Sequence, residues 1–454
     1  MPHDFRSLIY TLEEQGQLLR VGREVDPEYE VNAVIKRVQK SVNQPILFEK
    51  VRGARFSLVS NVFGRRDSVP LSLGLPKSHL LAEMTEREAN PIPVRRSDQG
   101  PVQEVVQVGS QVNLEELPII VHSEGDAGRY ITGGVLIAKH PDTGVNNASW
   151  NRVQLVSDDK LRVRMMPPQH LGRLHALAEE RGQPLETAIV IGAPPGLMFS
   201  AASKIPFETD ELEVAGAWQG EALEVVRCKT IDLDVPAHAE IVLEGQVLPG
   251  TREDEGPFGE FTDSFVPVMK NHVFQVKALT RRRDPLYHTI FAGGEEDLRL
   301  LGIPIEQQVF KHVRQYVPRI AGISTTGFVF GVVIAIHKEN EDQPKNAMLA
   351  ALASYAWIKL AIVVDDDVDI EDAADVLWAV QTRCRPDSGV MLVPGVPSYT
   401  REDVRAMHSG KMAIDATLPL DYRRVGQRRR VPGEESLDLR DYLGDQISAV
   451  LSQR

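Results

Sequence analysis

The sequence predicts a multidomain fold of the α+β or α/β class, with a small N-terminal α/β unit, a central β-barrel-like domain and a C-terminal α/β domain. Its 454 residues suffice for two or three domains with a large buried core. Short β-rich runs crowd the middle of the chain, whereas helix-like and strand-like patterns alternate on either side of it. A content of 42% hydrophobic and 25% charged residues is ordinary for a globular protein.

The N-terminal α/β unit is expected to comprise residues 1–104. Apolar residues at Phe5, Leu8 and Leu12 recur at helical spacing, which predicts a first helix. A second helical pattern covers residues 31–38, and short apolar runs suited to strands follow it.

The central domain is expected to comprise residues 105–296. The preceding segment Asn90–Gln99 combines two prolines with charges and is typical of a connection between domains. Helical patterns interrupt the domain at Leu171–Arg181 and Leu212–Trp218, and the density of strands predicts a barrel. The strand-like runs are Gly134–Lys139, Val153–Val156, Leu161–Met166, Ala188–Ile191, Glu224–Cys228, Ile241–Leu248 and His272–Leu279.

A linker helix at residues 297–318, with its pattern running from Leu298 to Val317, leads to a C-terminal α/β domain at residues 319–454. Alternating strands and helices there imply βαβ crossovers and a parallel or mixed sheet. A charged helix is expected at Leu437–Leu451. The other predicted elements are the strands Val329–Ile336, Leu360–Val364 and Val390–Val393 and the helices Asn346–Trp357 and Ala373–Arg383.

Composition excludes several classes of protein. A formal net charge of −13 without a basic patch argues against a general affinity for nucleic acid. The N-terminus has no signal-peptide layout, and no apolar run reaches the roughly 18 residues of a membrane span. Cys228 and Cys384 are the only cysteines and suggest neither a disulfide framework nor a thiolate metal site. We therefore expect a cytoplasmic protein without nucleic-acid or membrane partners.

Two glutamates, Glu255 and Glu260, bracket the turn EGPFGE and are the first candidate functional residues. Pro257 disfavours a helical conformation for Gly256, and a strand would place residues five apart on opposite faces, so a Gly/Pro turn is the natural way to converge the two side chains. Two carboxylates held close cannot both ionise cheaply, which favours acid/base chemistry. A solvated acidic turn on the surface is the alternative.

Three further polar residues accompany the turn, and each has a structural alternative. Arg152, in the run NASWNR, offers a planar fork for a carboxylate or phosphate, although arginines at strand ends are often structural. His170 stands at the start of a predicted helix as a metal ligand or a structural imidazole. Glu211 opens another predicted helix, where capping alone would explain an acidic residue.

Taken together, the order and spacing of these pieces resemble the UbiD-type decarboxylases, a family of reversible (de)carboxylases that use prenylated FMN. The resemblance covers nearly the whole chain, and the EGPFGE turn is highly specific to the family. It implies that the central domain is a split β-barrel that binds the flavin. The matching segments are Asn147–Arg152, Gln169–His170, Glu211–Gly216, Glu255–Glu260, Ile362–Asp367 and Gly410–Thr417.

The resemblance also implies two metal sites and a set of flavin contacts. Asn147, His170 and Glu211 would bind Mn²⁺ or Mg²⁺ next to the cofactor phosphate, and an amide, an imidazole and a carboxylate suit such a cation. A nearby K⁺ would be held by Glu211 and by backbone carbonyls of Ala148, Ser200 and Ser203. The implied cofactor-binding residues are Asn147, Trp150, Asn151, Arg152, Arg164, Met165, Met166, Gln169, His170 and Glu211.

By the same resemblance, Arg152, Glu255 and Glu260 are the catalytic residues. Arg152 would hold the substrate carboxylate, Glu255 would pair with Arg152, and Glu260 would donate the proton that replaces CO₂. The implied reaction is a non-oxidative, reversible decarboxylation at an sp² carbon through a covalent adduct with prenylated FMN. An electron-sink cofactor is required because no side chain absorbs the electron pair that CO₂ leaves behind.

The substrate expected from the family is an aromatic, heteroaromatic or α,β-unsaturated carboxylic acid. Positions similar to the family's pocket, Leu301, Ile305 and Trp357–Ile358, are apolar here and fit a flat acid or, equally, the core. Implied partners are a flavin prenyltransferase that supplies the cofactor and a second copy of the chain in a homodimer or larger assembly. A flavin oxidoreductase on a similar barrel and a non-catalytic cofactor-holding subunit are the alternative functions.

Overall fold

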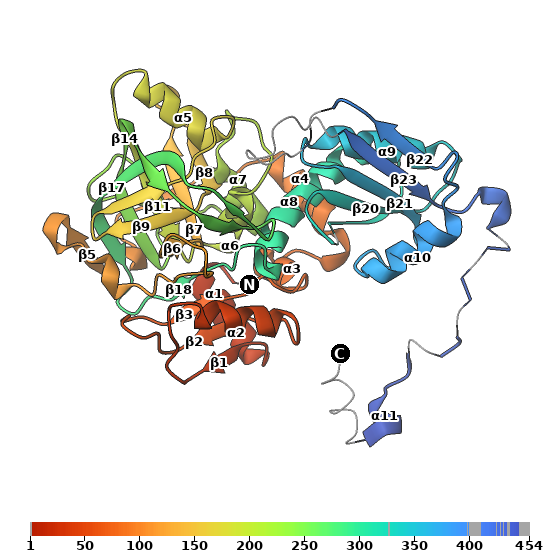
Figure 1. The fold of residues 1–454 in the computed structure, drawn as a ribbon, viewed down its shortest axis with the longest axis horizontal. Coiled ribbons are helices and arrows are strands. Elements are labelled where there is room, and N and C mark those ends of the chain that lie inside the picture. Colours follow the sequence, from red (N-terminus) through yellow and green to blue (C-terminus); the bar gives the residue numbers. More distant parts are fainter. Residues whose placement is uncertain are drawn as a thin grey trace. The chain divides into compact units, whose positions relative to one another are not determined.

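The computed structural model describes residues 2–325, 327–396, 398, 410–423, 425–426, 428–429, 431–433 and 436–444 (Figure 1). Two compact units divide the chain, and each is described by itself. The first contains the described residues up to Gln39 together with Asn43–Gln307. The second contains Lys40–Val42 and the described residues from Gln308 onward.

The N-terminal part of the first unit is a small sheet with four helices, and the sequence predicts the first two of them. Strands β1 (Leu19–Val21) and β2 (Ile46–Phe48) are parallel, and β3 (Leu58–Ser60) runs antiparallel to β2. Strand β18 (Tyr287–His288), which follows the barrel in the chain, completes the sheet beside β3. The helices are α1 (Phe5–Glu14), α2 (Glu30–Gln39), α3 (Ser68–Leu73) and α4 (Leu80–Glu88).

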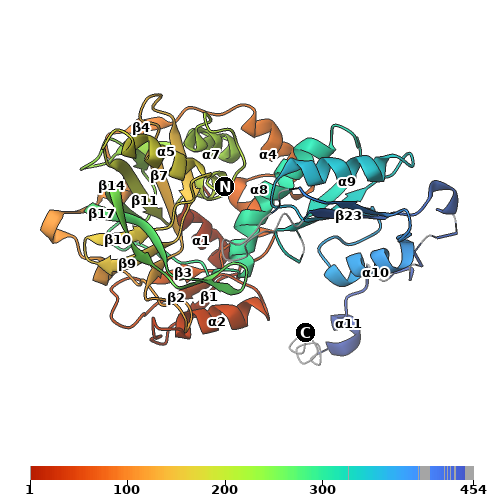
Figure 2. The ribbon, with the colours of Figure 1, turned by 45° about the horizontal axis from the view of Figure 1, so that its top comes forward.

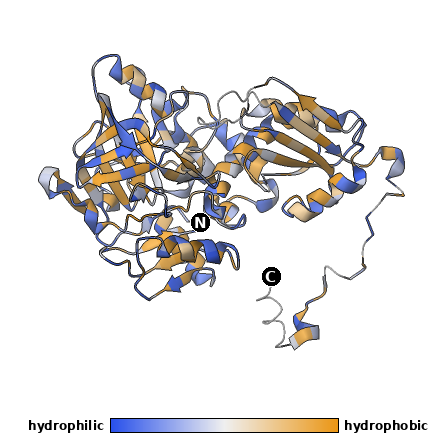
Figure 3. Ribbon diagram, viewed as in Figure 1, coloured by the Kyte–Doolittle hydropathy of each residue, from blue (hydrophilic) through white to orange (hydrophobic). Residues whose placement is uncertain are grey.

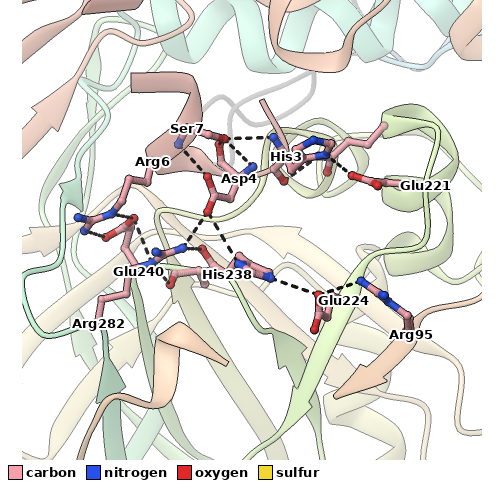
Figure 4. A network of polar contacts seen from close by, with 12 residues as sticks. His3, Asp4, Arg6, Ser7, Arg95, Glu221, Glu224, His238, Glu240 and Arg282 are labelled. Carbon is pink, nitrogen blue, oxygen red and sulfur yellow. Dashed lines mark hydrogen bonds and ion pairs between the residues drawn. The ribbon is translucent and has the colours of Figure 1, made fainter. Parts of the chain in front are cut away.

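A network of charged side chains ties helix α1 to the barrel (Figure 4). Arg6 forms a double hydrogen bond with Glu240, with Nε–Oε1 and Nη2–Oε2 distances of 3.0 and 2.6 Å. Arg282 donates to Asp4, the N-cap residue of α1, at 2.8 Å and lies 3.4 Å from Glu240. Because the Glu240 carboxylate is fully buried, its two arginine partners compensate the cost of removing it from water.

The central domain is a nine-stranded antiparallel sheet in the order β6-β9-β10-β17-β14-β11-β7-β8, with β5 added beside β17. Its end strand β8 continues along the chain almost directly into β9, which lies next to the opposite end of the sheet. The two ends must therefore lie close together, which makes the sheet a barrel split between β8 and β9. The strands are β5 (Val105–Val108), β6 (Tyr130–Ile131), β7 (Gly134–Lys139), β8 (Asn146–Trp150), β9 (Val153–Ser157), β10 (Lys160–Val163), β11 (Leu185–Ile191), β14 (Ile241–Glu255) and β17 (Met269–Arg281).

Shorter elements surround the barrel. Helices α6 and α7 pack against each other, and α5 packs against the barrel strands β7, β8, β11 and β14. A small sheet joins β4 (Arg95–Ser97), β12 (Glu224–Arg227) and β13 (Asp234–Pro236), and a hairpin joins β15 (Phe258–Glu260) to β16 (Ser264–Val266). The helices are α5 (His170–Glu179), α6 (Pro195–Ser200) and α7 (Glu211–Gln219), while α8 (Glu295–Val313) leads from the first unit into the second.

The second unit is a five-stranded mixed sheet in the order β19-β20-β21-β23-β22. Helix α9 covers one face of the sheet and α10 covers the other (Figure 2). The strands are dominated by hydrophobic residues, as expected for a sheet covered on both faces (Figure 3). The elements are β19 (Ile320–Ser324), β20 (Gly331–Ile336), α9 (Gln343–Ser354), β21 (Leu360–Asp365), α10 (Ala373–Arg383), β22 (Val390–Val393) and β23 (Lys411–Ala416).

The predicted α+β, multidomain class is confirmed, although some boundaries differ. The linker helix begins at Glu295 rather than Leu298, because its first turn is acidic rather than apolar, and it ends at Val313. Of the predicted helix Leu437–Leu451, the structure shows α11 (Arg440–Leu443), and residues 445–451 lie outside the described residues. Among the described residues, none of the helices has the length and hydrophobicity that a transmembrane span requires.

Candidate active site

Arg152 stands at the split of the barrel. Strand β8 ends at Trp150 and β9 begins at Val153, so Asn151 and Arg152 form the link between the two ends of the sheet. The link is fixed by its own hydrogen bonds: the Asn151 side chain donates to the carbonyl of Arg164 at 2.8 Å and accepts from the Ser149 hydroxyl at 2.9 Å. The Arg152 side chain is thus held at a defined position, and only 7% of it is exposed.

The EGPFGE turn brings both glutamates to this arginine, as the Gly/Pro pattern predicts. Glu255 ends the long strand β14, and Glu260 ends the short strand β15. The peptide bond between Gly256 and Pro257 is cis, and Gly256 has a φ of 92°, a conformation that favours glycine. Both carboxylates reach the same guanidinium, that of Arg152.

Arg152 is shared by the two glutamates. Its Nε and Nη2 donate to Oε1 and Oε2 of Glu255 at 2.9 and 2.8 Å, and its Nη1 donates to Oε1 of Glu260. These bonds use three of the five N–H donors of a guanidinium, so two remain for a ligand by this count. The Glu255 side chain is fully buried, whereas 21% of the Glu260 side chain is exposed. Burial acts to lower the pKa of Arg152, but the hydrogen bond to Glu255 and the charges of both glutamates outweigh it and hold the pKa above its ordinary value.

Aromatic rings close this site on one side. The Arg152 guanidinium lies 5.1 Å from the centre of the Phe258 ring, a cation–π distance, and the Tyr130 ring is 4.5 Å from the same ring. Tyr130 is fully buried, and its hydroxyl has no hydrogen-bond partner among the described residues. Burial, followed by the negative charge of Glu255, raises the pKa of Tyr130 well above its ordinary value, so Tyr130 is a neutral phenol beside the ion pair.

Sequence patterns missed three residues that hold the site together: Tyr130, Asn271 and Asp126. Asn271 donates from its side chain to Oε2 of Glu255 at 2.8 Å. Asp126 accepts the backbone N–H of Gly259 at 2.8 Å. The sequence does contain a signal for Asn271, because it alternates with Val273 on the buried face of β17. A buried amide needs hydrogen-bond partners, which marks it among apolar residues. No local pattern distinguishes Asp126 or Tyr130.

The proposed metal ligands also converge, although they come from three elements. Asn147 lies on β8, and His170 and Glu211 are the first residues of α5 and α7. Oε1 of Glu211 is 3.0 Å from Asn147 Nδ2 and 3.4 Å from His170 Nδ1, and Oε2 accepts the N–H of Ala148 at 3.3 Å. Burial raises the pKa of the Glu211 carboxyl, partly offset by His170.

These three side chains fit a hard divalent cation. The Oδ1 atom of Asn147 is buried without a hydrogen-bond partner among the described residues, which leaves it available as an oxygen ligand. No group of three His, Cys, Asp or Glu side chains suited to a metal occurs in the described parts of the chain. The proposed site therefore needs the amide oxygen of Asn147 as its third ligand. The N-termini of α5 and α7 also point two helix dipoles toward the set, which favours a phosphate beside the cation.

The proposed K⁺ carbonyls and flavin contacts lie in the same region. The carbonyl of Ser200 accepts the N–H and hydroxyl of Ser203 at 3.0 and 2.6 Å, and α6, which ends at Ser200, packs against α7. Trp150 donates from Nε1 to the carbonyl of Met198 at 2.8 Å, so its indole is fixed by backbone. Arg164 lies 3.8 and 3.7 Å from the sulfur atoms of Met269 and Met166.

Other predicted positions are placed as follows. Met165 is buried, and Gln169 is the N-cap residue of α5. Ile305 and Ile358 are almost fully buried, each within its own unit, as core residues are. The roles of these residues in cofactor and substrate binding stay predictions, as do the carbonyl ligands of K⁺.

Family models match the chain from near its start to its C-terminal sheet. The 3-octaprenyl-4-hydroxybenzoate carboxy-lyase N-terminal domain matches residues 9–88, the Rift-related domain residues 94–295 and the C-terminal domain residues 299–416. The chain belongs to the UbiD family. As a UbiD family member it is a carboxy-lyase, an enzyme of non-oxidative, reversible decarboxylation.

Relatives of this UbiD family member include enzymes of known structure. The anhydromevalonate phosphate decarboxylase of Methanothermobacter thermautotrophicus is 34% identical over 89% of this chain and 95% of its own. The UbiD-class enzyme HmfF from Pelotomaculum thermopropionicum, in complex with FMN, is 38% identical with a TM-score of 0.91, covering 97% of this chain and 100% of HmfF. An evolved dimeric form of HmfF contains prenylated FMN. The 3,4-dihydroxybenzoic acid decarboxylase of Enterobacter cloacae is 26% identical with a TM-score of 0.88, covering 97% of this chain and 98% of that one.

Proposed function

We propose that this UbiD family member decarboxylates an aromatic, heteroaromatic or α,β-unsaturated carboxylic acid with prenylated FMN, using Arg152, Glu255 and Glu260. The observation that carries the proposal is the buried guanidinium of Arg152, which Glu255 holds by two hydrogen bonds while Glu260 takes a third. A carboxylate is the complementary ligand for the remaining N–H groups.

Arg152 and Glu255 orient the substrate. Because Glu255 occupies the Nε and Nη2 side of the guanidinium, the remaining donors face away from that edge and define one direction of approach for the substrate carboxylate. The Phe258 ring and the buried surroundings exclude water, which strengthens this ion pairing.

Glu260 supplies the proton. When the bond between the substrate and its carboxyl group breaks, CO₂ leaves, and the same carbon receives a proton from the Glu260 carboxyl. Prenylated FMN, when bound, supplies the electron sink for the pair left by that bond. The partial exposure of Glu260 gives its carboxyl a route to regain a proton from solvent, which the fully buried Glu255 lacks. In the reverse direction Glu260 accepts the proton and Arg152 holds the newly formed carboxylate.

Asn147, His170 and Glu211 would hold Mn²⁺ or Mg²⁺ against the cofactor phosphate, with K⁺ beside Glu211 and the carbonyls of Ala148, Ser200 and Ser203. The unpartnered Oδ1 of Asn147 supports the divalent site. We further propose a flavin prenyltransferase as the supplier of the cofactor and a homodimer or larger homo-oligomer as the active assembly.

Hydride transfer does not require an arginine shared by two glutamates, so the arrangement favours decarboxylation over a flavin oxidoreductase. A cofactor-holding subunit should lack at least one of these side chains, and all three are present. The substrate screen should include phosphorylated α,β-unsaturated acids as well as aromatic acids, because one relative bears the name of a phosphorylated substrate.

The test uses protein produced together with a flavin prenyltransferase and a panel of these acids, with CO₂ release and deuterium incorporation from D₂O as readouts. The Glu260→Gln variant should bind the flavin but lose turnover, because an amide has no acidic proton to donate. Glu253→Gln, which alters a glutamate of the neighbouring strand β14 paired at the surface with Lys160 and Arg162, should retain turnover. Turnover by Glu260→Gln at the wild-type rate would remove Glu260 from the mechanism.

A further inference from the structure

Asn271 is a neutral side chain that donates a hydrogen bond to the ion pair at the proposed site. It lies on β17 opposite Glu253, two residue pairs away from the pairing of Met269 with Glu255, and its side chain reaches diagonally to Glu255. The Nδ2 atom donates to Oε2 of Glu255 at 2.8 Å, and the residue is 6% exposed. Glu255 therefore accepts three hydrogen bonds, two from Arg152 and one from Asn271.

The chemistry of this partner matters because two carboxylates compete for one guanidinium. A second cation beside Glu255 would neutralise it and weaken its hold on Arg152, whereas a carboxyl would repel it. A primary amide does neither, since it donates a hydrogen bond without carrying charge. The amide thus fixes Glu255 while leaving its negative charge for Arg152.

We propose that Asn271 is a positioning residue that acts through Glu255: it holds the carboxylate that orients the Arg152 guanidinium toward the substrate. The inference rests on the proposed function of Arg152. Asn271 donates to the Glu255 oxygen that also accepts Nη2 of Arg152, so a shift of that oxygen would turn the guanidinium. The fully buried carboxylate has no route to solvent that could replace the lost donor.

Two variants of the flavin-loaded enzyme test the proposal. Asn271→Leu keeps the branching at Cγ and removes the donor, and kcat should fall about 10- to 100-fold, the usual effect of a lost hydrogen bond to a charged group. Asn271→Asp introduces a carboxyl beside Oε2 of Glu255, and the two can coexist only by sharing a proton. The ratio of the Asn271→Asp kcat to the wild-type kcat should therefore decline with rising pH, by up to tenfold per pH unit.

Gln275 is a matched control, because it is an amide on the same strand that donates to the Asp159 carboxylate at 3.0 Å on the exposed surface. Gln275→Glu should leave the pH profile of kcat unchanged. A purely structural role for Asn271 would lower activity by the same factor at every pH. Such a parallel profile, or a wild-type kcat for Asn271→Leu, would overturn the proposal.

A crystal structure of Asn271→Leu provides a readout that does not depend on turnover. The double hydrogen bond between Arg152 and Glu255 should be lost or displaced, whereas an unchanged pair would overturn the proposal even if Asn271→Asp failed to fold. If the wild-type enzyme decarboxylates none of the acids tested, the proposed function fails, and this structural result still decides the positioning role of Asn271.

Discussion

Asp126 and Gly259 are joined by a hydrogen bond of 2.8 Å from the backbone N–H of Gly259 to Oδ1 of Asp126. The other oxygen of Asp126 accepts the N–H of Ser123 at 2.7 Å, and the N–H of Ala127 donates to the carbonyl of Pro257 at 2.9 Å. The loop that precedes β6 therefore holds the EGPFGE turn at two points. Gly259 is the residue before Glu260, so this loop sets the position of the proposed proton donor.

The Asp126→Ala variant should lower kcat about tenfold or more, because the loss of a charge-assisted hydrogen bond releases the strand that carries Glu260. The flavin content should stay at the wild-type level, since Asp126 does not contact the proposed metal ligands. Steady-state kinetics and the absorbance of bound flavin measure the two quantities. An unchanged kcat would show that the turn keeps its position without this hydrogen bond.

The Glu255→Gln variant should be strongly destabilised, by about 3–5 kcal/mol, because it leaves the buried Arg152 cation with a neutral partner. The matched Glu253→Gln variant should lose about 1 kcal/mol or less, since Glu253 pairs with Lys160 and Arg162 at the partly exposed surface. Urea unfolding of both variants measures the difference. Equal losses would mean that Glu260 alone compensates the charge of Arg152.

Removal of the divalent cation should be measurable without turnover. We expect the protein loaded with flavin and Mn²⁺ to bind one Mn²⁺, detected by electron paramagnetic resonance, and to release it to a chelator. Asn147→Leu should bind Mn²⁺ at least about tenfold more weakly, because it removes the oxygen that has no other partner. Asn146→Leu, which changes the adjacent amide that donates to Asp210 at 2.7 Å, is the control and should retain the ion. Full Mn²⁺ binding by Asn147→Leu would exclude this amide as a ligand.

Acid should destabilise the first unit through His122. Burial lowers the pKa of His122 to about 4, and the ring is neutral, since it lies between the side chain of Asn32 at 3.0 Å and the carbonyl of Tyr130 at 3.2 Å. A histidine in the unfolded chain has a pKa near 6.5. Between about pH 6.5 and 4 the ring is therefore protonated in the unfolded chain and neutral in the folded chain. The contribution of His122 to stability is therefore complete above that window and falls with decreasing pH, by about 2 kcal/mol at pH 5.

Urea unfolding at pH 7 and pH 5 tests this dependence. His122→Asn should lose about 2 kcal/mol of the difference between the two pH values, whereas the exposed His79→Asn should keep all of it. An identical pH dependence in wild type and His122→Asn would show that His122 is protonated in the folded protein.

Several elements of this protein follow from local patterns alone. Helix α10 (Ala373–Arg383) and strand β22 (Val390–Val393) have the bounds that periodicity predicts, and the Gly/Pro turn does bring Glu255 and Glu260 together. Such features depend on residues within a few positions of one another, for which backbone preferences decide the structure. The family resemblance extended the prediction to Arg152 and to the set of Asn147, His170 and Glu211.

Tertiary structure decided which distant side chains meet and how the charges are shared. Arg152 and Glu255 are 103 residues apart in the chain, and they meet because β9, which follows Arg152, and β14, which ends at Glu255, belong to one sheet through β10 and β17. Pairing of β6 with β9 and of β17 with β14 brings Tyr130 and Asn271 to the site, and Asp126 comes from the loop before β6. Spacing alone could not reveal them, because pairing between distant strands is set by the packing of the whole sheet and not by any local period. The sequence by itself determined the turn and its two acids, and the fold determined that both of them share one buried arginine.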